Sequence, residues 1–167
     1  MKSSDDKDFF FYKHFSEGGS VYLMAGLDKT NSDYNDLLSI ACHFARNGKN
    51  AQVLAPIHYK DTRYHDIFGA LIGTEYYRKC PDLLIDGEFY EYESYEPPFE
   101  MEKVERMVSR GAKQSRNIVI DVRESSATKK VVNNKIKRLK SQKTFESKIE
   151  SIWAFDGETV ELVYKNK

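Results

Sequence analysis

The sequence predicts an α/β or α+β domain in which helices flank a single mixed β-sheet. Apolar residues recur at helical spacing in several segments, and these segments alternate with short β-branched and aromatic runs bounded by glycine or proline. Two pairs of such runs are joined by Asp-Gly, the dipeptide typical of tight hairpin turns. Helices and strands that alternate in this way are expected to share one core.

The first half of the chain contains one well-marked helix. The polar cluster Asn31-Ser32-Asp33 precedes apolar residues spaced three and four apart, and Gly48 follows them, so the segment has both a start and a stop signal. The expected elements are a fraying polar tail (residues 1–8), an aromatic run that becomes buried (9–12), a strand (21–25), the helix (34–45) and a strand (51–55) stopped by Pro56.

A long segment from residue 57 to residue 79 shows only weak periodicity. It contains three pairs of neighbouring histidine or tyrosine residues, His58-Tyr59, Tyr64-His65 and Tyr76-Tyr77. A connection of this length without secondary structure is uncommon in a compact domain. We therefore expect the segment to be functional or partly helical.

The second half predicts two hairpins, two helices and a covered strand. Asp86-Gly87 joins an apolar run to an alternating one, and Asp156-Gly157 joins the last two runs. The uninterrupted apolar run that starts at Asn117 is typical of a strand covered on both faces. The expected elements are a hairpin (81–94), a helix (101–112), the covered strand (117–122), a helix from Thr128 through Leu139 and a hairpin (149–164).

Size and composition fit one water-soluble domain. The chain has 167 residues, 40% of them hydrophobic and 31% charged, and 26 basic residues balance 26 acidic ones. We expect residues 9–167 to form a single domain, because the length is ordinary for one core. No apolar stretch approaches the roughly 20 residues of a membrane helix. With no secretory signal and only two cysteines, a cytoplasmic location is expected.

Three carboxylates are the strongest chemical signal. Side chains alternate along a strand, so Glu91 and Glu93 share one face, and hairpin pairing would bring Asp82 close to Glu91. Converging carboxylates favour a hard cation such as Mg²⁺ or Mn²⁺, and phosphodiester cleavage is one chemistry that uses such a cation. Exposed glutamates also protect strands against aggregation, and that alternative stays open.

Net neutrality hides a separation of charge. Acidic residues dominate from Glu88 to Glu102, whereas basic residues dominate from Lys129 to Lys148. A basic helix beside a carboxylate site would suit a protein that binds a nucleic-acid backbone. The candidates for such contacts are Lys113, Lys129, Lys130, Lys135, Lys137 and Arg138. A solvated helix face is the alternative.

Other kinds of site are weakly supported. The four histidines and two cysteines lack the spacing of a zinc site, and no glycine-rich phosphate loop is present, so neither zinc nor a nucleotide cofactor is expected. His58 and His65 could transfer protons, although a lone histidine is more often structural or simply exposed. Neither Cys42 nor Cys80 has the setting of a nucleophile.

Five segments carry a resemblance to known proteins. They are a helix followed by residues 48–54 (GKNAQVL), residues 80–87 (CPDLLIDG), residues 89–94 (FYEYES), a helix that ends with residues 112–114 (AKQ), and residues 116–121 (RNIVID). This succession resembles the C-terminal nuclease domains of contact-dependent growth-inhibition toxins, several of them tRNases, and more generally the PD-(D/E)XK nucleases. The resemblance spans roughly residues 33–164 and implies a restriction-endonuclease-like core with a C-terminal hairpin.

The resemblance also implies roles for individual residues. Asp82 and Glu91 would bind the metal, Mg²⁺ or Mn²⁺, and Gln114 would be a helix residue near the scissile phosphate. Glu93 stands where the pattern has a lysine, and a glutamate cannot supply positive charge to a phosphate. Either another base such as Lys113 replaces that lysine, or the site is degenerate and does not cut.

The expected partners follow from these alternatives. An active domain would take RNA, tRNA in particular, or DNA, and an immunity-type or effector protein would bind it. The chain also looks like small proteins of bacterial conjugative elements, for which a non-catalytic binding or accessory role is the alternative. A metal-independent RNase of the barnase-like fold is a further reading. Another alternative is a structural protein that buries Tyr90, Tyr92, Tyr95 and Phe99 against a partner.

Overall fold

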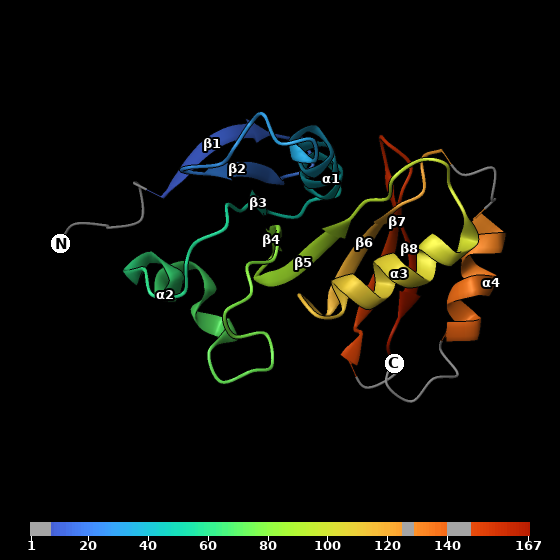
Figure 1. Cartoon of the computed structure of the whole chain (residues 1–167). Helices are drawn as coiled ribbons and strands as arrows, with labels where there is room; N and C mark the ends of the chain where they lie inside the picture. Colours follow the sequence, from blue (N-terminus) through green and yellow to red (C-terminus); the bar gives the residue numbers. More distant parts are fainter. Residues whose placement is uncertain (1–7, 125–128, 140–147) are drawn as a thin grey trace. The chain divides into compact units, whose positions relative to one another are not determined.

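The computed structural model describes residues 8–124, 129–139 and 148–167. Its elements, shown in Figure 1, are β1 (Phe9–His14), β2 (Ser20–Met24), α1 (Tyr34–Arg46), β3 (Ala51–Val53), α2 (Thr62–Phe68), η2 (Gly69–Leu71), β4 (Leu83–Ile85), β5 (Glu88–Glu93), α3 (Met101–Gly111), β6 (Asn117–Asp121), α4 (Lys129–Leu139), β7 (Ser151–Phe155) and β8 (Val160–Lys165). The chain divides into two compact units, Met1–Glu88 and Phe89–Lys167.

The first unit pairs its strands in the order β1-β2-β3-β4. β1 and β2 are antiparallel, β2 and β3 are parallel, and β3 and β4 are antiparallel. Helix α1 provides the crossover that parallel strands require, and it buries one apolar face against β2, β3 and β4. That face consists of Leu37, Ile40, Ala41, Phe44 and Ala45.

The second unit pairs its strands in the order β5-β6-β7-β8, of which the first three are parallel and the last is antiparallel to its neighbour. α3 and α4 are the two crossovers, and both pack on the same face of the strands (Figure 1). Their apolar residues join Ile118, Ile120 and Ile152 in one core. All five residues of β6 are buried, as expected for the covered strand.

The structure confirms the mixed α/β architecture. Apart from β1, α2 and η2, the described helices and strands lie close to where the sequence places them, as do both Asp-Gly turns, and Asp86 and Gly87 have positive φ angles of 47° and 84°. The long central segment is partly helical, because α2 and η2 occupy its middle. Thr128, the expected cap of α4, lies outside the described residues, as do residues 1–7 of the expected tail.

The expectation that the first aromatic run becomes buried is wrong. The run at the start of the chain forms β1, whose side chains lie mostly in solvent, with Phe10 60% and Phe11 63% exposed. The hairpin aromatics instead belong to the interior, since Tyr90 and Tyr92 are only 7% and 5% exposed. Within the described residues β1 pairs with β2 alone, whereas β5 pairs with β6 and packs its tyrosines into the second unit.

No helix in the described part of the chain is both long enough and apolar enough to span a membrane.

Candidate functional site

The two glutamates of β5 share a face, as the alternation of the strand predicts. Tyr90 and Tyr92 point to the opposite, buried side, while Glu91 and Glu93 are half-buried. β5 runs parallel to β6 with Glu91 opposite Ile118 and Glu93 opposite Ile120. Because Ile118 and Ile120 pack against α3, the two carboxylates lie on the face of the second unit that this helix covers.

Glu93 forms an ion pair with α3. Nε of Arg110 donates to Oε2 of Glu93 at 2.8 Å, and its Nη2 donates to the carbonyl oxygen of Ser94 at 2.7 Å. The Glu93 side chain is 13% exposed and the Arg110 side chain 56% exposed. Position 93, where the nuclease pattern has a lysine, therefore carries a carboxylate. Arg110 on α3 balances the negative charge of that carboxylate.

The close approach of α3 depends on a glycine. A Cβ added to Gly111 would lie 2.6 Å from Cγ2 of Ile118 and 3.4 Å from Cγ of Glu93. Real side-chain carbons do not come as close as the shorter of these distances, so only glycine fits in the last turn of α3 without a shift of its neighbours. This contact places Arg110 beside β5.

Asp82 belongs to the first unit. It immediately precedes β4, its side chain is half-buried, and its carbonyl oxygen accepts a hydrogen bond from the Leu54 amide at 2.8 Å. The backbone of Asp82 is therefore fixed by the residue that follows β3. Its role as a metal ligand together with Glu91 rests on the sequence pattern.

Lys113 and Gln114 lie in the turn between α3 and β6. α3 ends at Gly111, so the expectation that Gln114 belongs to a helix is wrong, and the amide of Gln114 donates to the Gly111 carbonyl at 2.9 Å. Lys113 is exposed and Gln114 half-buried. The charge that contacts Glu93 comes instead from Arg110, which no motif in the sequence marks.

Of the basic residues of α4, the structure describes the side chains of Lys135, Lys137 and Arg138. Nζ of Lys135 lies 3.4 Å from Oε2 of Glu105 on α3, which directs this lysine toward the neighbouring helix. Lys137 and Arg138 are exposed. The side chains of Lys129 and Lys130 fall outside those that the structure describes.

Metal-binding groups are sparse. Among the described residues, no group of three or more histidine, cysteine, aspartate or glutamate side chains lies close enough together to hold a metal ion. The metal ligands expected from the sequence are two protein carboxylates, those of Asp82 and Glu91. Mg²⁺ commonly binds one or two carboxylates and completes its shell with water and substrate phosphates, so the donor chemistry of Asp82 and Glu91 suits that ion.

A buried polar network crosses the start of the parallel strands. The Ser151 hydroxyl donates to Oδ1 of Asn117 at 2.7 Å, and Nε1 of Trp153 donates to that hydroxyl at 3.0 Å. Nδ2 of Asn117 and Oγ of Ser115 both donate to the Phe89 carbonyl, at 3.1 and 2.8 Å. Asn117, the polar residue that opens the apolar run of β6, is the sequence signal for this network, which fixes the starts of the parallel strands.

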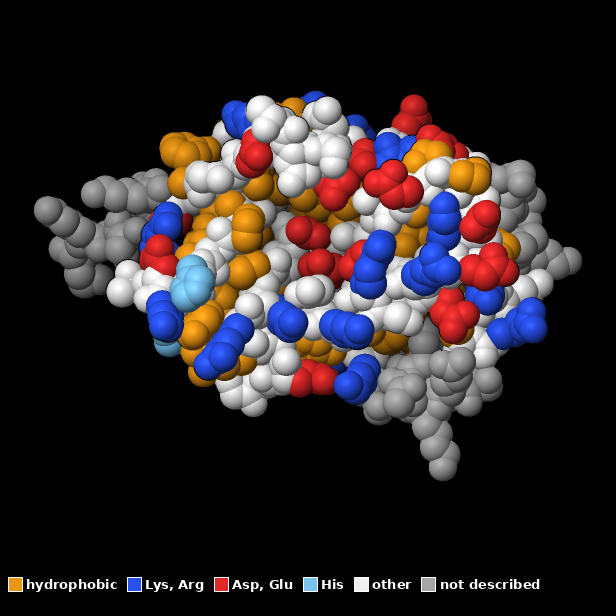
Figure 2. Space-filling view, viewed as in Figure 1, with side chains coloured by type: hydrophobic (Ala, Val, Ile, Leu, Met, Phe, Trp, Pro, Cys, Tyr) orange, Lys and Arg blue, Asp and Glu red, His pale blue; other side chains and the backbone are white. Residues whose placement is uncertain are grey.

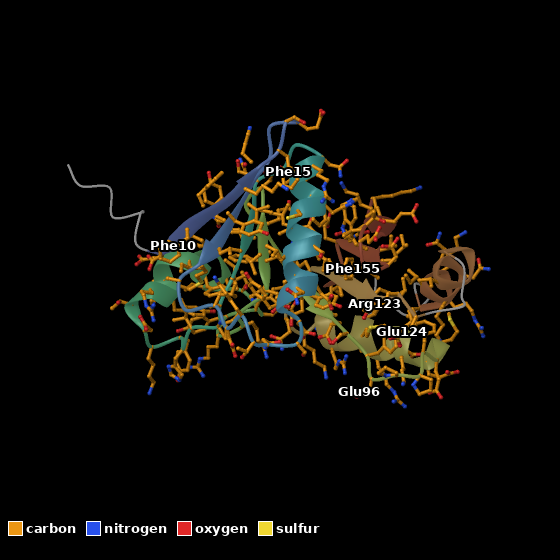
Figure 3. The ribbon with its side chains drawn as sticks, turned by 90° about the horizontal axis from the view of Figure 1, so that it is seen from above. Phe10, Phe15, Glu96, Arg123, Glu124 and Phe155 are labelled. Atoms are coloured by element: carbon orange, nitrogen blue, oxygen red, sulfur yellow. The ribbon has the colours of Figure 1, made fainter. Side chains whose placement is uncertain are left out.

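A second network lies at the other end of β6. Nε of Arg123 donates to both carboxylate oxygens of Asp121 at 3.1 Å, and its Nη2 donates to the Tyr92 hydroxyl at 3.0 Å. The guanidinium of Arg123 also lies 5.2 Å from the ring centroid of Phe155; both residues are labelled in Figure 3. Nearby, the Tyr95 hydroxyl accepts from the Glu124 amide, and burial raises the Tyr95 pKa. These bonds fasten the residues after β6 to the second unit.

The remaining candidates for proton or thiol chemistry have ordinary surroundings. His58 and His65 are exposed. Burial raises the pKa of the Cys42 thiol, which disfavours the nucleophilic thiolate. Sγ of Cys80 donates to the Ile57 carbonyl at 3.2 Å.

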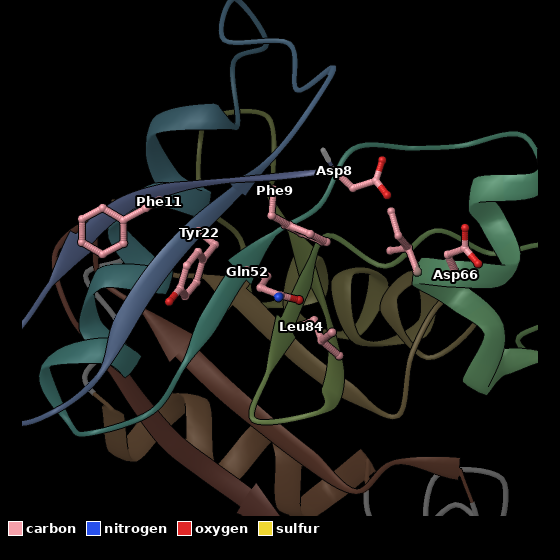
Figure 4. Close-up of a pocket in the computed structure, with 8 residues that line it drawn as sticks. Asp8, Phe9, Phe11, Tyr22, Gln52, Asp66 and Leu84 are labelled. Carbon is pink, nitrogen blue, oxygen red and sulfur yellow. The ribbon is translucent and has the colours of Figure 1, made fainter. Parts of the chain in front are cut away.

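The first unit also contains an open pocket of about 520 Å³ (Figure 4). Phe11 and Tyr22 line one side of it and the carboxylates Asp8 and Asp66 the other, with Gln52 and Leu84 between them. None of the residues expected from the sequence to form the site is among those that line it.

A comparison with known families finds a match. Residues 79–160 match the model of the contact-dependent growth inhibition CdiA C-terminal domain, which is just under half of the chain. No curated protein and no solved structure matches. The matched segment starts three residues before Asp82 and includes Glu91, Glu93 and Arg110.

Proposed function

We propose that this chain is a toxin-type nuclease domain that cleaves phosphodiester bonds of RNA, tRNA in particular, or of DNA with the help of Mg²⁺ or Mn²⁺. The observation that carries the proposal is the match of residues 79–160 to the CdiA C-terminal domain. This match contains every carboxylate that the sequence singles out, and growth inhibition is an effect that cleavage of an essential nucleic acid would produce.

The proposal gives each residue a separate task. Asp82 and Glu91 are the metal ligands, and the bound ion polarises the phosphate and activates water when it is present. Gln114, next to α3, is available to hydrogen-bond the phosphate through its amide. Lys113, Lys137 and Arg138 are exposed cations that can neutralise the backbone of the substrate.

Arg110 supplies the positive charge that the pattern expects at position 93. Its guanidinium is half in solvent and already lies on the carboxylate face of β5. Arginine stays protonated and presents several N–H donors in one plane, so it can bond Glu93 on one edge and a phosphate oxygen on another. In the nuclease pattern the positive charge belongs to a lysine of the strand. In this chain it would come from Arg110 on the neighbouring helix α3.

A non-catalytic accessory protein is the second candidate, and one observation favours it. The acid at position 93 is held by Arg110 in an ion pair, so a closed pair could be the whole purpose of this contact. Such a protein would keep the fold and its partners without cutting. An immunity-type protein would be the expected partner of an active domain, and the cytoplasm is the compartment in which its nucleic-acid substrates occur.

Cleavage and metal binding test the proposal together. Purified protein is incubated with tRNA, other RNA and DNA in Mg²⁺ or Mn²⁺, and Mn²⁺ is titrated calorimetrically into the same protein. We expect Asp82→Ala and Glu91→Gln to lose Mn²⁺ binding and to lower cleavage by more than about a hundredfold, since a metal contributes several kcal/mol to the transition state. Glu158→Gln, an exposed turn carboxylate, is the matched control.

The accessory alternative has its own readout. If the wild-type chain neither binds Mn²⁺ nor cleaves any of these substrates, the nuclease proposal is wrong. The paired substitution Glu93→Lys with Arg110→Glu restores the lysine of the pattern and keeps the ion pair. Cleavage that appears only in this double variant would identify the natural site as degenerate.

A further inference from the structure

The segment between α2 and β4 holds an arginine in an unusual backbone conformation. Arg78 has φ +72°, and apart from Asp86 in its hairpin turn it is the one described non-glycine residue with positive φ. Asp86 is accounted for by its turn, whereas Arg78 follows no hairpin. Left-handed backbone is uncommon for any residue with a Cβ, so such a residue persists only where the surroundings impose it, and it often marks a ligand site.

Tyr64 imposes this conformation. Its hydroxyl accepts a hydrogen bond from the Arg78 amide at 2.9 Å and donates one to the Lys79 carbonyl at 2.9 Å. Tyr64 is fully buried on α2, and burial raises its pKa, so the hydroxyl is protonated and able to donate. One buried hydroxyl therefore fixes two consecutive peptide groups.

The Arg78 side chain is held in turn by two aromatic rings. Its guanidinium carbon lies 4.4 Å from the ring centroid of Tyr59 and 5.5 Å from that of Tyr77, and these two rings meet edge to face. His58 stacks on Tyr59 with centroids 4.6 Å apart, and Nζ of Lys60 lies 5.9 Å from the same ring. Figure 2 shows basic and histidine side chains beside apolar ones over the α2 end of this unit.

This arrangement leaves the hydrogen-bonding edge of Arg78 for a ligand. A cation–ring contact forms no hydrogen bond to a ligand-type acceptor, so the N–H donors of a guanidinium beside an aromatic ring stay available. In the part of the chain that the structure describes, no carboxylate lies within ion-pair distance of Arg78, and the side chain is exposed. The nearby Asp61 is already engaged by Arg63, with Nη2 and Oδ2 3.0 Å apart.

The cluster also lies on the path to Asp82 within the same unit. Residues 54–59 continue from β3 and residues 77–82 lead into β4, and the two segments run side by side through the Leu54–Asp82 and Cys80–Ile57 hydrogen bonds. Asp82 follows Arg78 by four positions, which is at most about 14 Å of extended chain. A ligand bound by Arg78 would therefore lie within a few nucleotides of Asp82.

We infer that Tyr59, Tyr77 and Arg78, with Lys60 beside them, form a phosphate clamp for a nucleic-acid strand. This inference rests on the proposed function for the choice of ligand. A guanidinium with a fixed plane suits two oxygens of one phosphate, which it binds through parallel hydrogen bonds. His58 and Tyr77 offer aromatic rings on which an unpaired base next to that phosphate can stack. Arg78 is a substrate-positioning residue in this account.

Binding to a labelled single-stranded RNA of twelve nucleotides, followed by fluorescence anisotropy in EDTA, tests the clamp without cleavage. We expect Arg78→Ala to weaken binding about tenfold and to lower the salt slope of log Kd by about one, as expected for one lost phosphate contact. Arg78→Lys retains the charge without the planar guanidinium, so its RNA affinity is expected to lie between those of the wild type and Arg78→Ala. Arg63→Ala, an exposed arginine already engaged by Asp61, is the matched control and should bind like the wild type.

Arg78→Gly separates binding from folding. Glycine adopts positive φ without strain, so this variant is expected to melt within a few degrees of the wild type while it loses RNA affinity like Arg78→Ala. Unchanged affinity in Arg78→Gly would overturn the clamp, and so would an equal loss in Arg63→Ala. Displacement of the RNA by polyglutamate at the same charge concentration would assign the cluster to an acidic protein and overturn the nucleic-acid ligand.

The clamp and the proposed nuclease function fail in different ways. Wild-type RNA binding that is lost in Arg78→Gly, without cleavage of any substrate, would support the clamp and contradict the nuclease. Cleavage by the wild type with an unaltered KM in Arg78→Gly would contradict the clamp and support the nuclease.

Discussion

Nε of Arg110 on α3 lies 2.8 Å from Oε2 of Glu93 on β5, so the cation and the acid of the candidate site come from different elements. The contact exists because Gly111 lets the last turn of α3 approach the strands. A substitution at Glu93, Arg110 or Gly111 is therefore expected to disturb the contact between α3 and β5 that the three residues share.

The ion pair should be measurable as a coupling energy. In a double-mutant cycle with Glu93→Gln and Arg110→Gln, we expect a coupling of about 0.5–1 kcal/mol in the free energy of unfolding. Glu93 is largely buried, but the exposed half of Arg110 lets salt screen the pair, so the coupling should fall in 1 M salt. Urea unfolding of the four proteins gives the value, and zero coupling at low salt would show that the contact contributes nothing.

Gly111→Ala should destabilise the protein even though alanine is the better helix former. The added carbon would lie 2.6 Å from Cγ2 of Ile118, a fully buried side chain, and overpacking of this kind costs about 1–3 kcal/mol. That loss exceeds the roughly 1 kcal/mol by which alanine favours a helix over glycine. Ser109→Ala, an exposed position in the same helix, should be neutral or slightly stabilising. A Gly111→Ala variant as stable as the wild type in urea would contradict this packing.

Asn117 should matter for stability because it joins three segments through buried hydrogen bonds. It is 5% exposed, and its amide joins the Ser151 hydroxyl to the Phe89 carbonyl. Asn117→Ala removes these bonds and leaves buried polar groups behind, which costs about 2 kcal/mol. Asn134→Ala on the exposed side of α4 is the comparison in thermal unfolding. Similar melting of the two variants would mean that the network is dispensable.

The C-terminal hairpin should lose stability in acid through Asp156. Burial, the largest single influence, raises the pKa of this carboxyl, but hydrogen bonds from the Thr159 and Glu158 amides and the Thr159 hydroxyl together lower it below its ordinary value of 3.8. A lowered folded-state pKa means that the carboxylate stabilises the fold above about pH 4, and that this contribution is lost as the pH falls through the folded-state pKa.

Asp156→Asn isolates that contribution because the amide does not titrate. The difference in unfolding free energy between wild type and Asp156→Asn should be constant from pH 7 to pH 5 and shrink below pH 4. A difference that remains constant down to pH 2.5 would assign the acid sensitivity to other carboxyls.

Local patterns predicted most of the elements. α1 has a polar cluster before it and a glycine after it, and both Asp-Gly turns lie where the chain reverses. Burial of β6 followed from its uninterrupted apolar run. The fate of the first aromatic run did not follow, because burial depends on what lies beside a strand and, within the described residues, β1 pairs with β2 alone.

The candidate site was harder to predict, because its contacts are not local. The shared face of Glu91 and Glu93 follows from alternation within one strand. Arg110 lies seventeen positions after Glu93, and its helical spacing indicated only an exposed face. Arg78 carried no signal in sequence, since its backbone conformation is set by Tyr64, fourteen positions earlier.

The bond between Tyr64 and the Arg78 amide gives the exposed side of the first unit an intrinsic reporter. An amide in a surface turn normally exchanges its hydrogen quickly, but this one is bonded to a hydroxyl that is buried from solvent. Its protection against deuterium should therefore follow the opening of α2 rather than the motion of the turn. Deuterium uptake at one peptide group would then show how firmly the helix holds the neighbouring arginine.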